Sequence, residues 1–129
     1  MDYPKLFADI HLRPGLSGLD GSYHDYCTFV RGVDIGNDRN LLAGFREMLV
    51  PRVGGGDNLT WDGLVLHLAF PDRTGGWREE AAGPGREAAN DQLFALLAEF
   101  FEKRASCCGL AEIYSGYLAW RKAQSWHRG

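Results

Sequence analysis

Histidine and cysteine side chains are the groups through which this chain could hold a metal ion. His24 and Cys27 are three residues apart, a spacing that places two potential ligands on one face of a helix. The adjacent Cys107 and Cys108 could add thiolates, but no second pair has the spacing of a zinc finger or a zinc ribbon. Cys27 also fits an apolar helical stripe, and a free cysteine usually acts as a small buried hydrophobe. We therefore expect a core cysteine, no metal site and no cofactor.

Nucleophilic catalysis would require a serine or cysteine, a base and a group that orients the base. None of the five serines lies in a nucleophile-elbow context, and the other histidines are scattered: His11, His67 and His127. The triple glycine at 54–56 is followed by Asp57, whereas a phosphate-binding loop ends in Gly-Lys-Ser or Gly-Lys-Thr. The sequence thus predicts no catalytic residues. The alternative is a small enzyme or ligand-binding domain whose site is assembled from dispersed residues such as His24, Asp25, His67 and Glu112.

The segment from residue 71 to residue 89 is the strongest candidate for a binding surface. It is rich in glycine and proline, and irregular segments of this length are often functional. Trp77 has no periodic apolar partner there, and tryptophan and arginine are enriched at binding hot spots. We expect residues 71–86 to contact a partner through polar and aromatic side chains: Asp72, Trp77, Arg78, Glu79 and Glu80. The competing interpretation is that Trp77 folds back to cap the core.

Hydrophobic periodicity predicts a mainly all-α fold of five to six helices, forming a single domain over residues 1–129. The helices are expected to begin near Pro4, after Ser22, after Asn37 or Asp38, after Thr60, at Asn90 or Asp91, and near Leu110. The residues expected to end helices are Arg13, Gly36, Pro51, Cys108-Gly109 and, approximately, Gln124. Residues 15–21 contain three glycines and are expected to form a loop.

The segment 64–70 fits two kinds of secondary structure. Apolar residues at positions 61, 64, 65 and 68 have helical spacing, whereas those at 64, 66, 68 and 70 alternate as in a strand. We favour a helix and keep a short strand as the alternative. Further along the chain the periodicity places Phe45, Leu97 and Phe101 in the core.

Composition and charge exclude several classes of function. Fourteen basic and 17 acidic residues give a net charge of −3, without the clustered basic excess that nucleic-acid binding requires. The longest apolar run, Leu64 to Phe70, is far too short to span a bilayer, and the N-terminus lacks the layout of a secretory signal. Three cysteines are an odd number and favour reduced thiols. The sequence therefore predicts a cytoplasmic protein that binds neither nucleic acid nor membrane.

Several short segments together resemble a group of small bacterial helical proteins: Arg13-Pro14-Gly15, Phe29-Val30-Arg31-Gly32, Leu42-Ala43-Gly44-Phe45, Asn58-Leu59-Thr60-Trp61 and Gln124-Ser125-Trp126. These proteins are similar in size and type to immunity proteins, which neutralise toxins in competition between bacteria. The resemblance implies a protein-binding module that binds a cognate toxin and occludes it. It carries over no catalytic or binding residue. A regulatory subunit with another protein partner is the remaining alternative.

Overall fold

Helices form all the regular secondary structure in residues 1–124, the part of the chain that the computed structural model describes. In chain order the α-helices are α1 (Tyr3–Leu12), α2 (Tyr23–Gly36), α3 (Phe45–Val53), α4 (Trp61–Ala69), α5 (Trp77–Ala82), α6 (Arg86–Ala105) and α7 (Gly109–Lys122). A short 3-10 helix, η1 (Pro14–Ser17), lies within the predicted loop after α1. The all-α prediction is confirmed, and residues 64–69 are helical. The predictions at Ser125, Trp126 and His127 lie outside the described residues.

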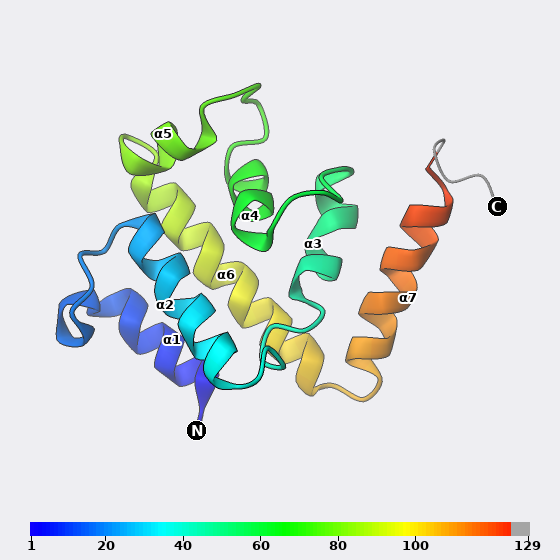
Figure 1. The fold of residues 1–129 in the computed structure, drawn as a ribbon, viewed down its shortest axis with the longest axis horizontal. Coiled ribbons are helices and arrows are strands. Elements are labelled where there is room, and N and C mark those ends of the chain that lie inside the picture. Colours follow the sequence, from blue (N-terminus) through cyan, green and yellow to red (C-terminus); the bar gives the residue numbers. More distant parts are fainter. Residues whose placement is uncertain (125–129) are drawn as a thin grey trace.

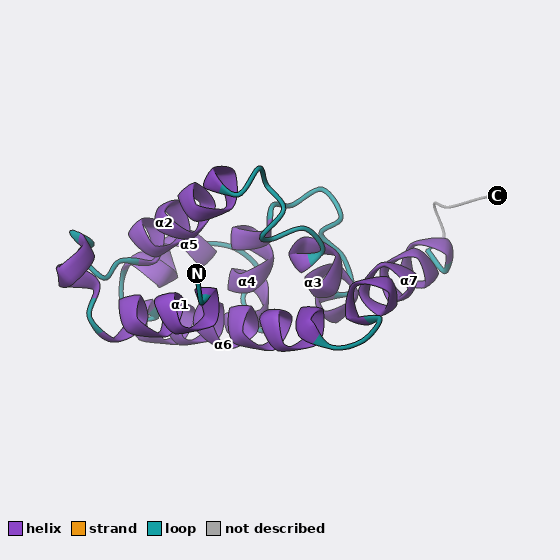
Figure 2. Cartoon of the chain, turned by 90° about the horizontal axis from the view of Figure 1, so that it is seen from below, coloured by secondary structure: helices purple, strands orange, loops and turns teal. Residues whose placement is uncertain are grey.

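The longest helix, α6, is the element on which the others assemble. All six of the other α-helices contact it (Figure 1). Its buried side chains form one broad face of the helix: Ala89, Asn90, Leu93, Phe94, Leu96, Leu97, Phe100 and Phe101. The opposite face, which includes Asp91, Ala95 and Glu102, is exposed. Figure 2 shows α1 and α6 side by side in the lower layer of the molecule, with α2, α3 and α4 above them. A wide apolar face on the longest helix gives several shorter helices a common surface to pack against, which explains its central place.

Capping residues fix where the first two α-helices begin. Asp2 accepts a hydrogen bond from the backbone N–H of Lys5 at 3.1 Å and caps α1. Ser22 accepts a hydrogen bond from the N–H of Asp25, also at 3.1 Å, and caps α2. The structure confirms both predicted helix starts.

The third helix begins later than the predicted start at residue 37 or 38. Asp38 and Arg39 adopt left-handed backbone conformations, with φ of 57° and 62°, and a right-handed helix cannot continue through them. α3 starts only at Phe45. Leu41 and Leu42 are nevertheless buried, from a loop. Their apolar spacing therefore marks burial and not a helix.

Pro51 lies inside α3, so the prediction that it ends this helix is wrong. The helix continues to Val53 and ends at Gly54, whose N–H donates to the carbonyl oxygen of Val50 at 2.9 Å. A proline in the last turn lacks a backbone N–H, so the helix loses one hydrogen bond there. The hydrogen bond from Gly54 to Val50 still closes the end of the helix.

α6 begins at Arg86, before the predicted start at Asn90 or Asp91. Its first turn, Arg86-Glu87-Ala88-Ala89, contains no large apolar residue, so hydrophobic periodicity does not mark it. The side chains of Arg86 and Asn90 donate to the carbonyl oxygen of Gly21, at 3.1 and 2.9 Å. These bonds tie the start of α6 to the loop that precedes α2.

A tight turn between α6 and α7 forms the predicted break at Cys108-Gly109. Cys108 has a left-handed φ of 66°. A Cβ atom on Gly109 would lie only 1.7 Å from the carbonyl oxygen of Lys103, so this position requires glycine. The two exposed thiols of Cys107 and Cys108 are 3.6 Å apart and form no disulfide.

One continuous hydrophobic core joins all the helices. Phe45 and Leu97 are fully or almost fully buried, and Phe101 is buried at the edge of the core. The structure confirms these three residues as core residues. In the described part of the chain, no helix is both long and apolar enough to cross a membrane.

Candidate functional site

The segment predicted to bind a partner folds onto the body of the protein as α5 and its flanking turns. α5 contacts α2, α4 and α6, and Ala81 is its buried residue. Gly76, with φ of 70°, precedes the helix, and Glu79 and Glu80 occupy the first turn, where acidic residues are favoured. The expectation of irregular structure throughout 71–89 is therefore wrong. Six residues contain too few apolar positions to reveal a helical period.

Trp77 begins α5 and packs against the core. It is half-buried, and its ring stacks on the His67 ring with centroids 4.1 Å apart and an interplanar angle of 19°. The His67 ring is itself held in place, because its Nδ1 lies 2.9 Å from the carbonyl oxygen of Gly63. The indole Nε1 is buried and has no acceptor among the described residues. This geometry fits the competing interpretation of Trp77, and its contact with a partner stays a prediction.

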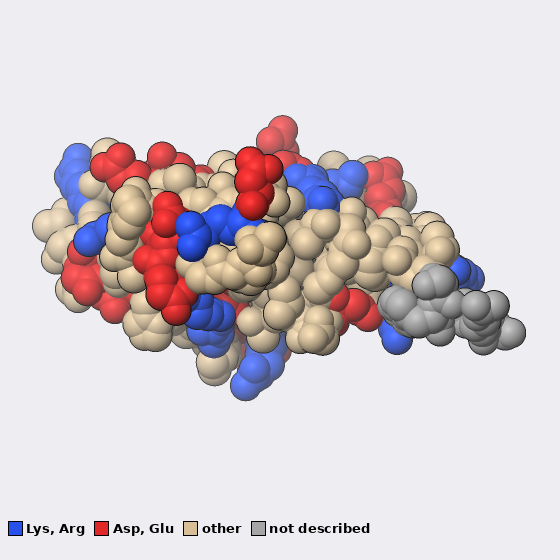
Figure 3. Space-filling view, turned by 90° about the horizontal axis from the view of Figure 1, so that it is seen from above, with Lys and Arg blue, Asp and Glu red and all other residues tan. Residues whose placement is uncertain are grey.

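The acidic residues of the predicted surface differ in their surroundings. Asp72 and Glu79 are exposed, and neither forms an ion pair within the described residues. Glu80 is half-buried and accepts a hydrogen bond from Arg73 at 3.2 Å. Figure 3 shows acidic and basic side chains interspersed over the half of the molecule that carries α5. Asp72 and Glu79 are thus the acids that stay available for an electrostatic contact.

Arg78 does converge with other functional groups, in a cluster around a buried carboxylate. Its Nη2 atom donates to Oδ2 of Asp62 at 3.1 Å, from a side chain that is 64% exposed. Nη2 of Arg31 lies 3.2 Å from Oδ1 of Asp62. The hydroxyl of Thr60 donates to the same Oδ1 atom. The Asp62 side chain is only 10% exposed, so α2, α4 and α5 meet at one paired, buried charge.

The cluster forms one wall of a pocket of about 270 Å³, which we call the Asp62 pocket. Its lining residues come from the start of α2 and from α4 and α5: Ser22, Tyr23, His24, Cys27, Arg31, Asp62, Arg78, Ala81 and Ala82. The Tyr23 hydroxyl donates to the backbone carbonyl of Asp62 at 2.6 Å, which fixes α2 against α4. Burial raises the pKa of the Cys27 thiol to about 12 and raises that of Tyr23 further. Both groups therefore stay protonated at neutral pH, and Cys27 is not an activated nucleophile.

Burial by itself would raise the pKa of the Asp62 carboxyl. Hydrogen bonds from Thr60 and Arg78, together with the positive charges of Arg31 and Arg78, outweigh burial and bring the pKa below 3.8. Asp62 is thus ionised at neutral pH and acts as a fixed negative charge.

We expect this shift to make the protein lose stability in acid. A carboxyl with a lowered pKa in the folded state stabilises the fold above its unfolded pKa, and this contribution disappears as the pH falls through the folded pKa. For Asp62 the loss occurs below pH 3.8. Urea unfolding of the wild type and of Asp62→Asn at several pH values measures it. The difference in unfolding free energy between the two proteins should shrink below pH 3.8; a difference independent of pH would contradict the assignment.

Sequence reasoning missed both Asp62 and Arg31 as site residues. Asp62 shares a helical face with the buried Val65 and Leu66, three and four positions further on. An acidic residue on an apolar face is the signal of a buried ion pair, because an unpaired charge there is too costly. No comparable signal in the sequence marks Arg31 and Arg78 as the partners of Asp62, since surface arginines are common.

The alternative dispersed site of four residues does not assemble. His24 lines the Asp62 pocket, whereas His67 lies under Trp77. Asp25 accepts a hydrogen bond from the N–H of Asp20, and Glu112 pairs with Lys103 beside the α6–α7 turn. Among residues 1–124, no group of three His, Cys, Asp or Glu side chains is arranged to hold a metal ion.

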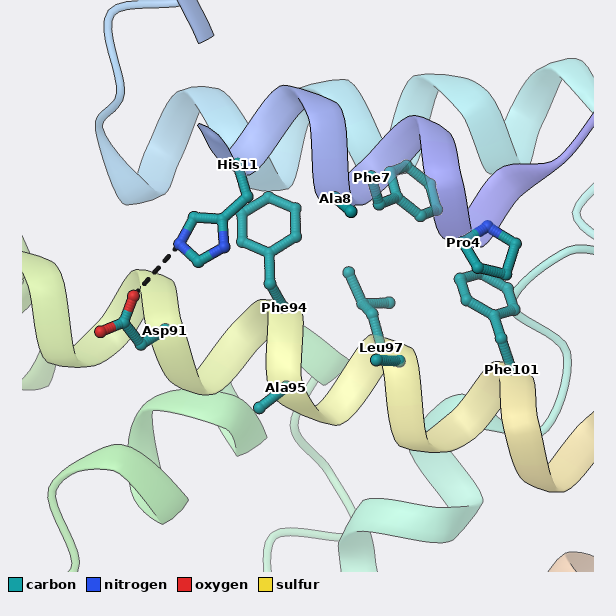
Figure 4. A pocket seen from close by; sticks show the side chains of 10 residues that line it. Pro4, Phe7, Ala8, His11, Asp91, Phe94, Ala95, Leu97 and Phe101 are labelled. Carbon is teal, nitrogen blue, oxygen red and sulfur yellow. Dashed lines mark hydrogen bonds and ion pairs between the residues drawn. The ribbon is translucent and has the colours of Figure 1, made fainter. Parts of the chain in front are cut away.

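A second concave region lies between α1 and α6. Figure 4 shows this groove of about 340 Å³, in which His11 points toward Asp91 at one end. Nε2 of His11 is 3.1 Å from Oδ1 of Asp91, and the His11 ring stacks on Phe94 with centroids 4.3 Å apart. The rest of the lining is aromatic or aliphatic: Pro4, Phe7, Ala8, Phe94, Ala95, Leu97, Ala98 and Phe101. The groove holds a single polar pair, and its lining contains no serine, cysteine or lysine that could act as the nucleophile of covalent catalysis.

α7 is the helix least covered by the rest of the chain. Only Gly109 and Ile113 of its 14 residues are buried. Tyr114 is 38% exposed and Leu118 is 51% exposed, one helical turn apart, and we call these two residues the α7 face. Figure 3 shows a broad stretch of uncharged atoms toward the end of the molecule that carries α7. This end therefore differs from the charged half around α5.

Comparison of the chain with protein-family models, with curated proteins and with solved structures finds no match in any of the three.

Proposed function

We propose that this protein is a protein-binding module, and more specifically an immunity protein that neutralises a cognate bacterial toxin by binding and occluding it. The observation that carries the proposal is the α7 face, where a tyrosine and a leucine are exposed on a helix that buries only two residues. Tyrosine is enriched at the centre of protein interfaces, and charged residues are depleted there. Figure 3 shows a stretch of uncharged atoms toward the end of the molecule that carries α7, bordered by charged side chains.

The residues around α5 support a second part of the same contact. Exposed acids without an ion pair among the described residues, such as Asp72 and Glu79, would attract a basic substrate groove on the toxin. Such rim charges act mainly on the association rate and are sensitive to salt. Arg78 is held on Asp62 and is therefore a less mobile contact residue than Asp72 or Glu79.

The decisive experiment is co-expression with a toxin encoded beside the gene for this protein. The protein should restore growth, and the purified pair should form a stable complex. Rescue without a physical complex would point to a regulatory role, and failure of both would remove the proposal. Self-association of the protein through α7 would appear as a dimer in light scattering without any toxin.

Replacing the α7 face should weaken this complex without unfolding the protein. We expect Tyr114→Ala combined with Leu118→Ser to cost at least about 2 kcal/mol of binding free energy, the scale of a hot-spot residue. The melting temperature should fall only moderately, because Leu118 is 51% exposed and Tyr114 is 38% exposed, and the affinity is measured at a temperature at which both proteins are folded. Titration calorimetry measures the affinity, and Leu16→Ser is the matched control because Leu16 is exposed outside α7. Equal losses in the control and in the α7 variant would contradict the assignment.

A further inference from the structure

We propose that the Asp62 pocket is a binding site for a monocarboxylate with a small apolar body. This inference does not depend on the proposed toxin partner, because it rests on the groups that line one pocket. The pocket has a volume of about 270 Å³. Its side chains offer more hydrogen-bond donors than acceptors, carry a net positive charge and include the apolar residues Ala81 and Ala82.

The donor surplus follows from the hydrogen bonds of the two arginines. A guanidinium group carries five N–H donors. Arg78 donates only to Asp62 within the described residues, and Arg31 contacts Asp62 and lies over the Trp61 ring, 5.2 Å from its centroid. Most of the donors of both groups are therefore available to a ligand.

The carboxylate of the pocket, in contrast, already has three partners. Oδ1 of Asp62 receives the Thr60 hydroxyl and faces Arg31, and Oδ2 receives Arg78. The Ser22 hydroxyl oxygen accepts from the N–H of Asp25. The free N–H groups of the two arginines therefore favour a ligand that offers acceptors, and a carboxylate offers two oxygens in the geometry that a guanidinium fork matches.

The charge of the pocket selects a monoanion. Among the groups whose charge is fixed at pH 7, two arginines and one aspartate sum to one positive charge, and His24 lines the pocket beside them. Cys27 and Tyr23 stay neutral at pH 7 because burial raises their pKa values. A phosphate monoester carries close to two negative charges and would lie beside the Asp62 carboxylate. A carboxylate brings a single charge, which the surplus arginine charge balances.

The remaining lining describes the body of the ligand. Ala81 and Ala82 of α5 and the apolar parts of Tyr23 and Cys27 line the pocket next to the charged groups. Pockets of this kind bind ligands through apolar contact and use a few polar groups to fix orientation. The volume suits a single aromatic ring or a short aliphatic chain.

Benzoate and its neutral isostere benzamide test the proposal. Backbone and arginine side-chain NMR signals of ¹⁵N-labelled protein are followed during titration at constant ionic strength. Benzoate should shift the signals of the pocket residues saturably, and benzamide should bind about tenfold more weakly, since it lacks the charge that strengthens these hydrogen bonds. The absence of saturable shifts with benzoate, or equal binding of the two probes, would overturn the proposal.

Arginine variants locate the binding site. Arg78→Gln should weaken benzoate binding about tenfold, and Arg78→Lys, which keeps the charge but loses the planar fork, should be intermediate. Arg73→Gln is the matched control, because Arg73 lies in the same segment and pairs with Glu80 outside the pocket. Circular dichroism and melting curves confirm that each variant is folded. Unchanged benzoate affinity in folded Arg78→Gln would place the binding elsewhere and overturn the assignment.

A final comparison separates the two sources of such a carboxylate. N-acetylphenylalanine imitates the C-terminus of a peptide, whereas benzoate represents a free acid. Tighter binding of N-acetylphenylalanine identifies a peptide terminus as the occupant, and tighter binding of benzoate identifies a small metabolite. Either result supports a carboxylate site. If neither acid binds, the proposed carboxylate site is wrong, and the test of the toxin complex is unaffected.

Discussion

Phe45→Ala is expected to lower the free energy of unfolding by about 3–5 kcal/mol, the largest effect we predict for a single substitution. Phe45 is completely buried at the start of α3. Its ring centroid lies 5.3 Å from that of Phe100 on α6 and 5.8 Å from that of Trp61 on α4. Phe45 therefore joins α3 to α4 and α6. Removing it leaves a cavity between α6 and two shorter helices that cannot easily close around it.

Equilibrium unfolding in urea measures this effect, with Leu118→Ala as the control. Leu118 is exposed, so its truncation should change the unfolding free energy by less than about 0.5 kcal/mol. Phe101 lies at the edge of the core and stacks on Phe7 of α1, with centroids 5.7 Å apart. Its truncation should cost less than that of Phe45. A loss below about 1 kcal/mol for Phe45→Ala would show that the three helices do not share one cooperative core.

The sequence predicts this core well, because burial follows directly from side-chain type. The apolar positions of α2 repeat at helical spacing, and the structure buries four of them: Tyr23, Tyr26, Cys27 and Val30. Caps are equally local, since Ser22 and Asp2 bond to N–H groups three residues away. Features that depend on neighbours in the sequence are thus accessible without a structure.

The parts that the sequence does not predict depend on contacts between distant segments. The loop between α2 and α3 is held by Asp34, which accepts a hydrogen bond from the N–H of Leu42 at 2.8 Å. The first turn of α6 contains no large apolar residue, and Arg86 and Asn90 bind the loop at residues 20–21. In the α2–α3 loop the apolar spacing of Leu41 and Leu42 points to a helix that does not form, and at the start of α6 no apolar spacing marks the helix that does. α5 has only six residues, too few to show a helical period.

The candidate site follows the same rule. The sequence points to Arg78 through its place beside Trp77, and its position does matter, because α5 brings it to Asp62. For Asp62, two residues after the Thr60 cap, the sequence indicates only a favourable charge near a helix N-terminus. Its pairing with Arg31, from a helix more than 20 residues earlier, could not be inferred from spacing. The pocket exists only once α2, α4 and α5 have packed together.

Trp77→Ala is expected to lower the free energy of unfolding by about 2–3 kcal/mol, less than a fully buried tryptophan because Trp77 is half-buried. The substitution removes the stack on His67 and the contact with the core. Trp77→Phe should cost less than about 1 kcal/mol, because it keeps an aromatic ring on His67 and removes a buried N–H that has no acceptor among the described residues.

Measuring unfolding and partner binding on both variants separates the structural role of Trp77 from its predicted contact with a partner. If the indole serves only the fold, Trp77→Phe retains both stability and affinity, and Trp77→Ala loses affinity only in proportion to its folded fraction. If the exposed edge of the indole is a contact, Trp77→Phe stays stable but loses about 2 kcal/mol or more of binding free energy. An unchanged melting temperature in Trp77→Ala would contradict the packing role, because a ring stacked 4.1 Å from His67 cannot be removed without loss if that contact supports α5.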